Sequence, residues 1–132
     1  MPVELEMVLR VLLAMVLGAI IGFQRGKAEK PAGMRDLILI STGSALFTVV
    51  SIYGFNADPA RVAAGIVTGI GFLGAGAIIR RGEGGVIKGL TTATTIWVTA
   101  GIGMAAGAGT YIIASVTTLL VLVVLLIHRR TT

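Results

Sequence analysis

Long runs of apolar residues alternate along the chain with short clusters of charged ones. The runs cover about residues 7–23, 36–53, 61–79, 90–105 and 110–127. A helix rises 1.5 Å per residue, so crossing a hydrocarbon core of about 30 Å takes about 20 residues. The run 90–105 is the short one, and it predicts either a short span inside a bundle or a re-entrant helix. The pattern predicts an all-α membrane protein, a polytopic bundle of about five transmembrane helices that forms a single domain over 1–132.

The composition supports a membrane protein with little or no soluble part. Of the 132 residues, 55% are hydrophobic and only 13% are charged. A soluble domain of this size cannot bury so much apolar surface. The net charge of +5 could suggest nucleic acid, but the basic residues flank the apolar runs, which favours membrane anchoring and excludes a nucleic-acid partner. The chain has no cysteine, so a disulfide framework or a thiolate metal site is excluded.

The basic residues also predict the orientation. With five spans, the loops 24–35 and 80–89 and the tail after 127 lie on one side of the membrane. They hold all of the 11 basic residues except Arg10 and Arg61. Because basic loops stay in the cytoplasm, we expect the N-terminus outside and the C-terminus inside.

The segment GIGFLG at 69–74 matches the G-x-G-x-x-G pattern of a dinucleotide-binding turn. That pattern is informative only after a strand and about 20 residues before an acid. Here the surrounding run is uncharged and no acid follows Glu83. We therefore expect no nucleotide site, and the glycines need another role.

Close helix packing is that role, because small residues let backbones approach each other in lipid. At about 100° per residue, Gly65, Gly69 and Gly76 share one face of the run 61–79, and Gly71 and Gly74 lie on the far side. We expect this helix to pack on two sides at the centre of the bundle, and a homodimer to form. The first run, 7–23, has small residues four positions apart at Gly18 and Gly22. The residues expected in helix packing are Gly18, Gly22, Gly65, Gly69, Gly71, Gly74 and Gly76.

Polar residues within and beside the runs leave two alternatives open. Asp58 and Arg61 mark the start of the third helix, either as a cap and an interfacial anchor or as a polar site at the outer mouth of the bundle. The hydroxyl residues either bond to helix carbonyls or line a partly hydrated path between the second, third and fourth helices. The possible path residues are Ser41, Ser44, Thr48, Thr91, Thr95 and Thr99.

Little in the chain suits catalysis, and we expect no enzyme and no cofactor. No histidine lies within a span, and the apolar runs hold no close pair of carboxylates. Mg²⁺ prefers carboxylate oxygens, and a transported cation commonly leaves an acid near the membrane centre. The six acids, Asp36 and Asp58 among them, lie at the ends of the runs. This argues against a dehydrated metal site within one protomer and leaves a hydrated path between protomers open.

Three long motifs carry a resemblance to the transmembrane region of the MgtC/SapB family of bacterial inner-membrane proteins. They are KPAGMRDLILISTGSALFTVVS (30–51), DPARVAAGIVTGIGFLGAGAIIRRG (58–82) and GLTTATTIWVTAGIG (89–103). The resemblance implies a multi-pass inner-membrane protein linked to magnesium limitation, intracellular survival or acid tolerance. Well-characterised members are regulators of membrane energetics that act on the ATP synthase, and a role in transport of Mg²⁺ or of another cation or protons is the alternative.

The resemblance also bears on single residues. Arg35, Asp58 and Arg61 match polar positions of the family, and the glycine-rich third helix matches as well. Where members have Glu-Arg after the first span, this chain has Gln24-Arg25, which weakens a proton or cation role there. Gly65 replaces a glutamine within the third span. The sequence ends at Thr132, so we expect a protein without the soluble C-terminal domain of many members.

Overall fold

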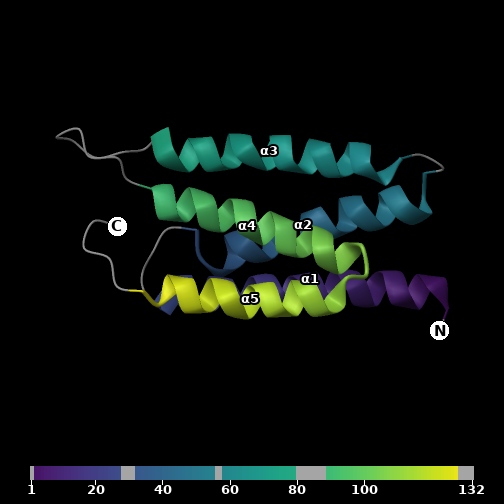
Figure 1. Ribbon diagram of the computed structural model, residues 1–132, viewed down its shortest axis with the longest axis horizontal. Coiled ribbons are helices and arrows are strands. Elements are labelled where there is room, and N and C mark those ends of the chain that lie inside the picture. The colour runs from purple at the N-terminus through teal and green to yellow at the C-terminus, as the bar shows by residue number, and fades with distance from the viewer. Residues whose placement is uncertain (1, 28–31, 56–57, 80–88, 128–132) are drawn as a thin grey trace.

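The computed structural model describes residues 2–27, 32–55, 58–79 and 89–127, and these form five helices. In chain order they are α1 (Val3–Lys27), α2 (Met34–Tyr53), α3 (Pro59–Ile79), α4 (Leu90–Gly107) and α5 (Tyr111–Leu125). The described ranges contain no strand. The helices lie side by side with their axes roughly aligned (Figure 1). The predicted all-α bundle is confirmed.

The ends of the helices follow local sequence signals. Proline begins α3, as expected for a residue whose missing N–H costs nothing in the first turn. Gly109, at φ +87°, provides the left-handed turn between α4 and α5, so these are two separate elements. By length and composition, α1, α2 and α3 can each cross a membrane, and α5 is a shorter apolar helix of 15 residues. Spanning by α4 and α5, and the orientation of the bundle, stay predictions.

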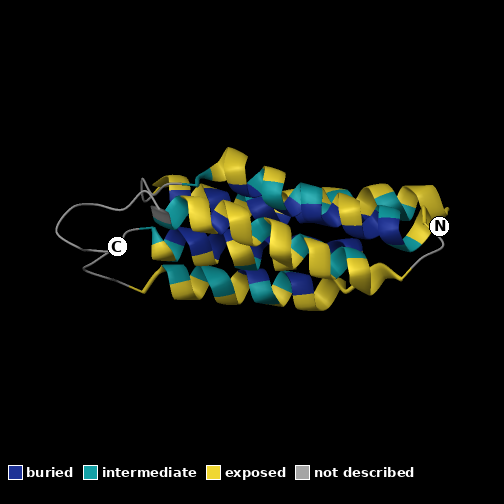
Figure 2. Ribbon diagram, turned by 90° about the horizontal axis from the view of Figure 1, so that it is seen from above, coloured by how far each residue is buried: buried dark blue, intermediate teal, exposed yellow. Residues whose placement is uncertain are grey.

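The outer surface of the bundle is strongly apolar. Buried residues lie on the inner faces of the helices and exposed ones on the outside (Figure 2). Many of the exposed residues are large and apolar. Phe72, Ile112 and Leu126, for example, are 78%, 81% and 72% exposed. Such a surface suits lipid, since a water-soluble monomer rarely exposes large contiguous apolar patches.

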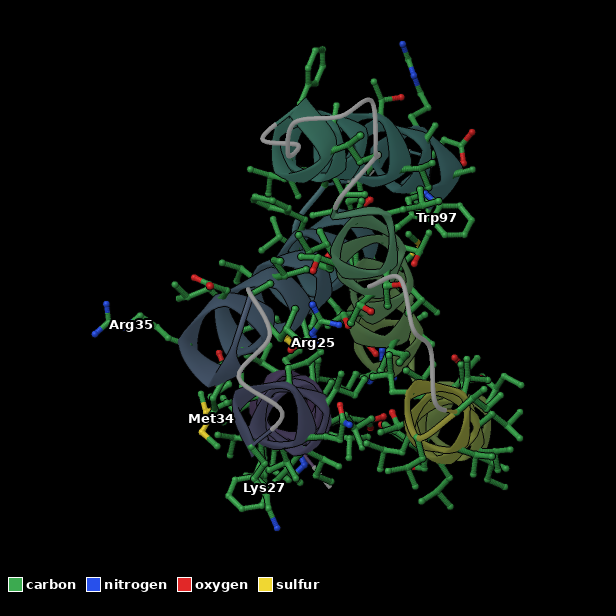
Figure 3. All side chains as sticks on the ribbon, turned by 90° about the vertical axis from the view of Figure 1, so that its left-hand side faces the viewer. Arg25, Lys27, Met34, Arg35 and Trp97 are labelled. Atoms are coloured by element: carbon green, nitrogen blue, oxygen red, sulfur yellow. The ribbon has the colours of Figure 1, made fainter. Side chains whose placement is uncertain are left out.

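The helix at the centre of the bundle is α4, because it contacts all four others. The expectation that α3 occupies the centre is wrong for the single chain: α3 lies at the edge and contacts only α4 and α2 (Figures 1 and 3). Of its glycines, only Gly74 is close to a neighbour, with a position for Cβ 3.6 Å from the carbonyl oxygen of Ala93. The others face open space: Gly65, Gly69, Gly71 and Gly76. Helical periodicity grouped these residues by face but could not tell which face is inside.

Candidate functional site: the polar interior of α1, α2 and α4

Ser41 of α2 lies between α1 and α4 and is fully buried. The single proton of its hydroxyl is shared between two carbonyl oxygens, that of Ala14 in α1 at 2.7 Å and that of Ile38 in its own helix at 3.2 Å. Gly18 of α1 and Gly103 of α4 border it, since a Cβ on either glycine would collide with Ser41. The hydroxyl therefore takes part in a contact between helices that only glycine neighbours allow.

Two further glycines bring the same helices together. At Gly22 a Cβ would lie 3.1 Å from the backbone nitrogen of Met34, and at Gly107 it would lie 2.7 Å from the carbonyl oxygen of Ala45. The sequence had indicated Gly18 and Gly22 as packing residues. Gly103 and Gly107 were not among the expected packing residues, although their spacing of four residues was an available signal.

The hydroxyl residues considered for a path lie on α2 and α4. Thr48 and Thr95 donate hydrogen bonds of 2.8 and 2.7 Å to the carbonyls of Ser44 and Thr91, one turn earlier in the same helix. This is the self-satisfied arrangement common for hydroxyls in helices. Thr99 is fully buried, and within the described ranges its hydroxyl has no hydrogen-bond partner. The interior thus contains hydroxyls that are already hydrogen-bonded to helix carbonyls, and at least one, that of Thr99, that could form a hydrogen bond if the helices rearranged.

Arg25 enters this interior at one end of the bundle. It is only 2% exposed, and its Nη2 donates a hydrogen bond to the hydroxyl of Thr92 in α4. Figure 3 shows Arg25 directed into the bundle, whereas Lys27 and Arg35 point outwards. A guanidinium is charged at any physiological pH, so Arg25 places a cationic group at this end of the interior.

The other charged candidates do not join Arg25 in one site. Arg35 and Asp36 are exposed in the first turn of α2. Asp58 and Arg61 are exposed at the opposite end of the bundle, where α3 begins (Figure 1). The Oδ1 of Asp58 accepts a hydrogen bond of 3.0 Å from the backbone N–H of Ala60, which is the geometry of a helix cap.

A second buried arginine, which the sequence interpretation did not propose as a site, lies near the N-terminal end of α1. Arg10 is 8% exposed and makes three hydrogen bonds. Nη2 donates to Glu6 at 2.8 Å, Nε to the hydroxyl of Tyr111 at 3.1 Å, and Nη1 to the carbonyl of Gly107 at 3.0 Å. The four-residue spacing of Glu6 and Arg10 was the one signal for this cluster.

This cluster ties four helices together at one end. The hydroxyl of Tyr111 donates to the same Glu6 oxygen at 2.8 Å, and the ring of Tyr53 in α2 lies 5.2 Å from the Arg10 guanidinium carbon. Gly109 lies against this cluster, since a Cβ there would lie 2.9 Å from Nη2 of Arg10, and its φ of +87° favours glycine. Within this cluster the carboxylate of Glu6 is neutralised by the guanidinium of Arg10.

Comparison with known proteins decides what kind of chain this is. The family model described as MgtC family matches residues 11–132. The chain belongs to the MgtC family. It is 49% identical over 129 residues to the "Putative magnesium transporter YhiD" of Escherichia coli K12, an alignment that covers 89% of this chain and 59% of the relative. It is 45% identical over 115 residues to protein MgtC of Salmonella typhimurium, covering 87% and 49%.

A third relative, an uncharacterised protein of Haemophilus influenzae, is 42% identical over 132 residues, an alignment that covers 92% of this chain and 55% of the relative. The chain thus spans about half to three-fifths of the length of these curated relatives. Of these three names, that of YhiD describes a putative magnesium transporter, and none states an enzymatic activity. No solved structure matches. The resemblance seen in the sequence motifs is confirmed at the level of the family.

Proposed function

We propose that this MgtC-family protein is a non-enzymatic regulator in the bacterial inner membrane, acting in membrane energetics or in adaptation to low Mg²⁺. The observation that carries the proposal is the charge of the interior. Both buried charged residues of the described bundle are arginines, Arg10 and Arg25. Glu6, the acid that contacts Arg10, is already bound by Arg10 and Tyr111.

Such an interior is unsuited to a divalent cation. Mg²⁺ is bound through carboxylate and other oxygen ligands and gives up its waters reluctantly. The described residues contain no group of three or more acids or histidines that could hold a metal ion. A cation moving between α1, α2 and α4 would also meet Arg10 and Arg25 at the two ends of this interior, and no carboxylate is among the buried side chains of the described residues.

A regulator needs a surface for its partner, and α3 offers one. Only about a tenth of its apolar window is buried within the chain, against a third or more for α1 and α2. Its glycines leave room for a neighbouring backbone, which is how helices associate in lipid. We propose that this face packs against a second copy of the chain, forming a homodimer, or against another membrane protein such as the ATP synthase.

Mg²⁺ transport is the second candidate, and Mg²⁺ would then be the substrate. The printed name of the YhiD relative favours it. So do Ser51 and Thr99, which are buried with hydroxyls that have no partner within the described ranges. A rearranged bundle could offer such groups to a hydrated ion.

Flux measurements separate the two functions. Purified protein in liposomes loaded with a Mg²⁺-sensitive dye is compared with Asp58→Asn, which keeps the cap at the start of α3 and removes its charge. We expect no Mg²⁺ uptake above that of empty liposomes from either protein. Robust uptake by the wild type, reduced in Asp58→Asn, would defeat the regulator and establish the transporter.

A further inference from the structure

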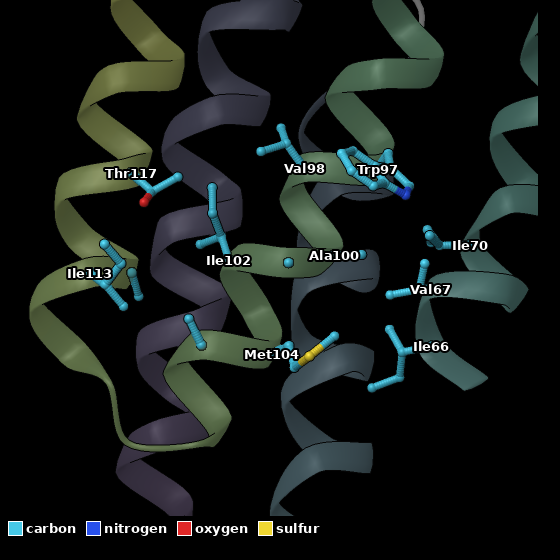
Figure 4. Close-up of a pocket in the computed structure, with 13 residues that line it drawn as sticks. Ile66, Val67, Ile70, Trp97, Val98, Ala100, Ile102, Met104, Ile113 and Thr117 are labelled. Carbon is cyan, nitrogen blue, oxygen red and sulfur yellow. The ribbon is translucent and has the colours of Figure 1, made fainter. Parts of the chain in front are cut away.

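Helix α5 is attached to the bundle by few packing contacts. Of its 15 residues only Ala114 and Thr118 are buried. On the side that faces α3, an apolar groove of about 260 Å³ lies over α4, and Ile113 and Thr117 of α5 line it on one side (Figure 4). Because packing holds α5 on one side only, a polar contact at its end can control whether it stays in place.

That polar contact is the ring formed by Glu6, Arg10 and Tyr111 at the start of α5. One carboxylate oxygen of Glu6 accepts two hydrogen bonds of 2.8 Å, from Nη2 of Arg10 and from the hydroxyl of Tyr111. Nε of Arg10 donates to the same hydroxyl at 3.1 Å, so each member contacts the other two. Within the described ranges no other side chain of α5 makes a hydrogen bond to another helix.

The ring depends on the negative charge of Glu6. Arg10 is only 8% exposed, and Glu6 is the one acid of the described residues that contacts it. The other groups that face Arg10 are the phenols of Tyr111 and of Tyr53 in α2, neutral below a pH of about 10, and the carbonyl of Gly107 in α4. Helix α3 contacts neither α1 nor α5. Protonation of Glu6 would therefore leave a buried cation among neutral groups, which is unfavourable.

We propose that Glu6, Arg10 and Tyr111 form an acid-sensitive latch that holds α5 against α1. The side chain of Glu6 is 32% exposed, so protons reach it from water. A proton on the carboxyl removes its charge and weakens the bonds from both donors, and α5 then moves away about the turn at Gly109. Glutamate carboxyls take up protons at a pH of about 4.3 and below, so the latch is closed at neutral pH and opens in acid. The latch goes beyond the proposed contact of α3 and does not depend on it.

Distance measurements between spin labels test the latch. The chain has no cysteine, so labels attach only at introduced ones. The pair Leu120→Cys in α5 and Leu39→Cys in α2, at exposed positions, reports on α5, and the pair Leu12→Cys and Leu39→Cys reports on α1 and α2. Full-length protein in detergent is compared by pulsed electron paramagnetic resonance at about pH 7 and about pH 3.5, on either side of the glutamate range.

We expect the population with a longer distance between α5 and α2 to rise about 3- to 10-fold in acid, while the distance between α1 and α2 stays unchanged. An unchanged distance between α5 and α2 would overturn the proposal. So would an equal change in both pairs, because it would show that acid unfolds the whole bundle.

Three variants test whether Glu6 is the group that takes up the proton. Glu6→Gln removes the charge at every pH, so it should show the longer distance already at neutral pH and respond no further to acid. Its matched control is Glu4→Gln, which removes an exposed carboxylate outside the ring and should respond as the wild type does. Tyr111→Phe keeps the aromatic ring but loses the hydroxyl, and its latch should open at a higher pH. A wild-type response to acid in Glu6→Gln would refute the latch.

Discussion

Gly103 in α4 lies against the backbone of α2, and replacing it by alanine tests the contact on which the interior depends. A Cβ here would lie 2.8 Å from the Cα of Ser41 and 2.9 Å from its carbonyl carbon, closer than van der Waals contact. Because these are backbone atoms, relief requires the two helices to move apart. Overpacking of this kind costs about 1–3 kcal/mol.

Two smaller effects act in opposite directions. Alanine favours a helix over glycine by about 1 kcal/mol. Movement of α2 away from its neighbours weakens the hydrogen bond of 2.7 Å from Ser41 to the carbonyl of Ala14, which contributes about 1 kcal/mol. Since these nearly cancel, we expect Gly103→Ala to lower the free energy of unfolding by about 1–3 kcal/mol.

Gly69→Ala in α3 is the matched control, since a Cβ at Gly69 meets no atom within 4 Å. It adds the same methyl group without a clash and should be neutral or stabilising by up to about 1 kcal/mol. Both variants are measured by reversible unfolding in mixed micelles, followed by the circular dichroism of the helices. If Gly103→Ala proves as stable as Gly69→Ala, α2 and α4 do not meet at this glycine and the reasoning fails.

Three further predictions concern assembly, the arginine cluster and topology. Gly69→Leu should leave the helical content of the monomer intact but lower the fraction of dimer seen by crosslinking, because Gly69 faces outwards from the bundle. An unchanged dimer fraction would exclude this face of α3 as the contact between the two copies. Arg10→Gln should lower the free energy of unfolding by about 1–3 kcal/mol, and the loss is only partial because Glu6 is partly exposed. The control Lys27→Gln, on the surface, should change it by less than about 0.5 kcal/mol, and equal effects of the two variants would contradict the buried cluster. A reporter fused to the C-terminus should be active only in the cytoplasm, and periplasmic activity would reverse the predicted orientation.

Local signals in the sequence were enough to predict the helices. The apolar runs, with Asp58 and Arg61 at the start of the third, placed five elements close to where the structure has them. The cap formed by Asp58 and the packing positions Gly18 and Gly22 also follow from spacing along one helix. These features depend on residues within one or two turns of each other, which a sequence displays directly.

Only the tertiary structure decided which face of each helix lies inside. In water an amphipathic helix shows its inner face by its apolar side, but in lipid both sides are apolar and that contrast is lost. For this reason the glycines of α3 predicted a central helix, whereas Gly103 and Gly107 make α4 the centre. The contact of Arg10 with Tyr111, 101 positions away, is equally absent from any local pattern, because it exists only once α1 and α5 lie side by side.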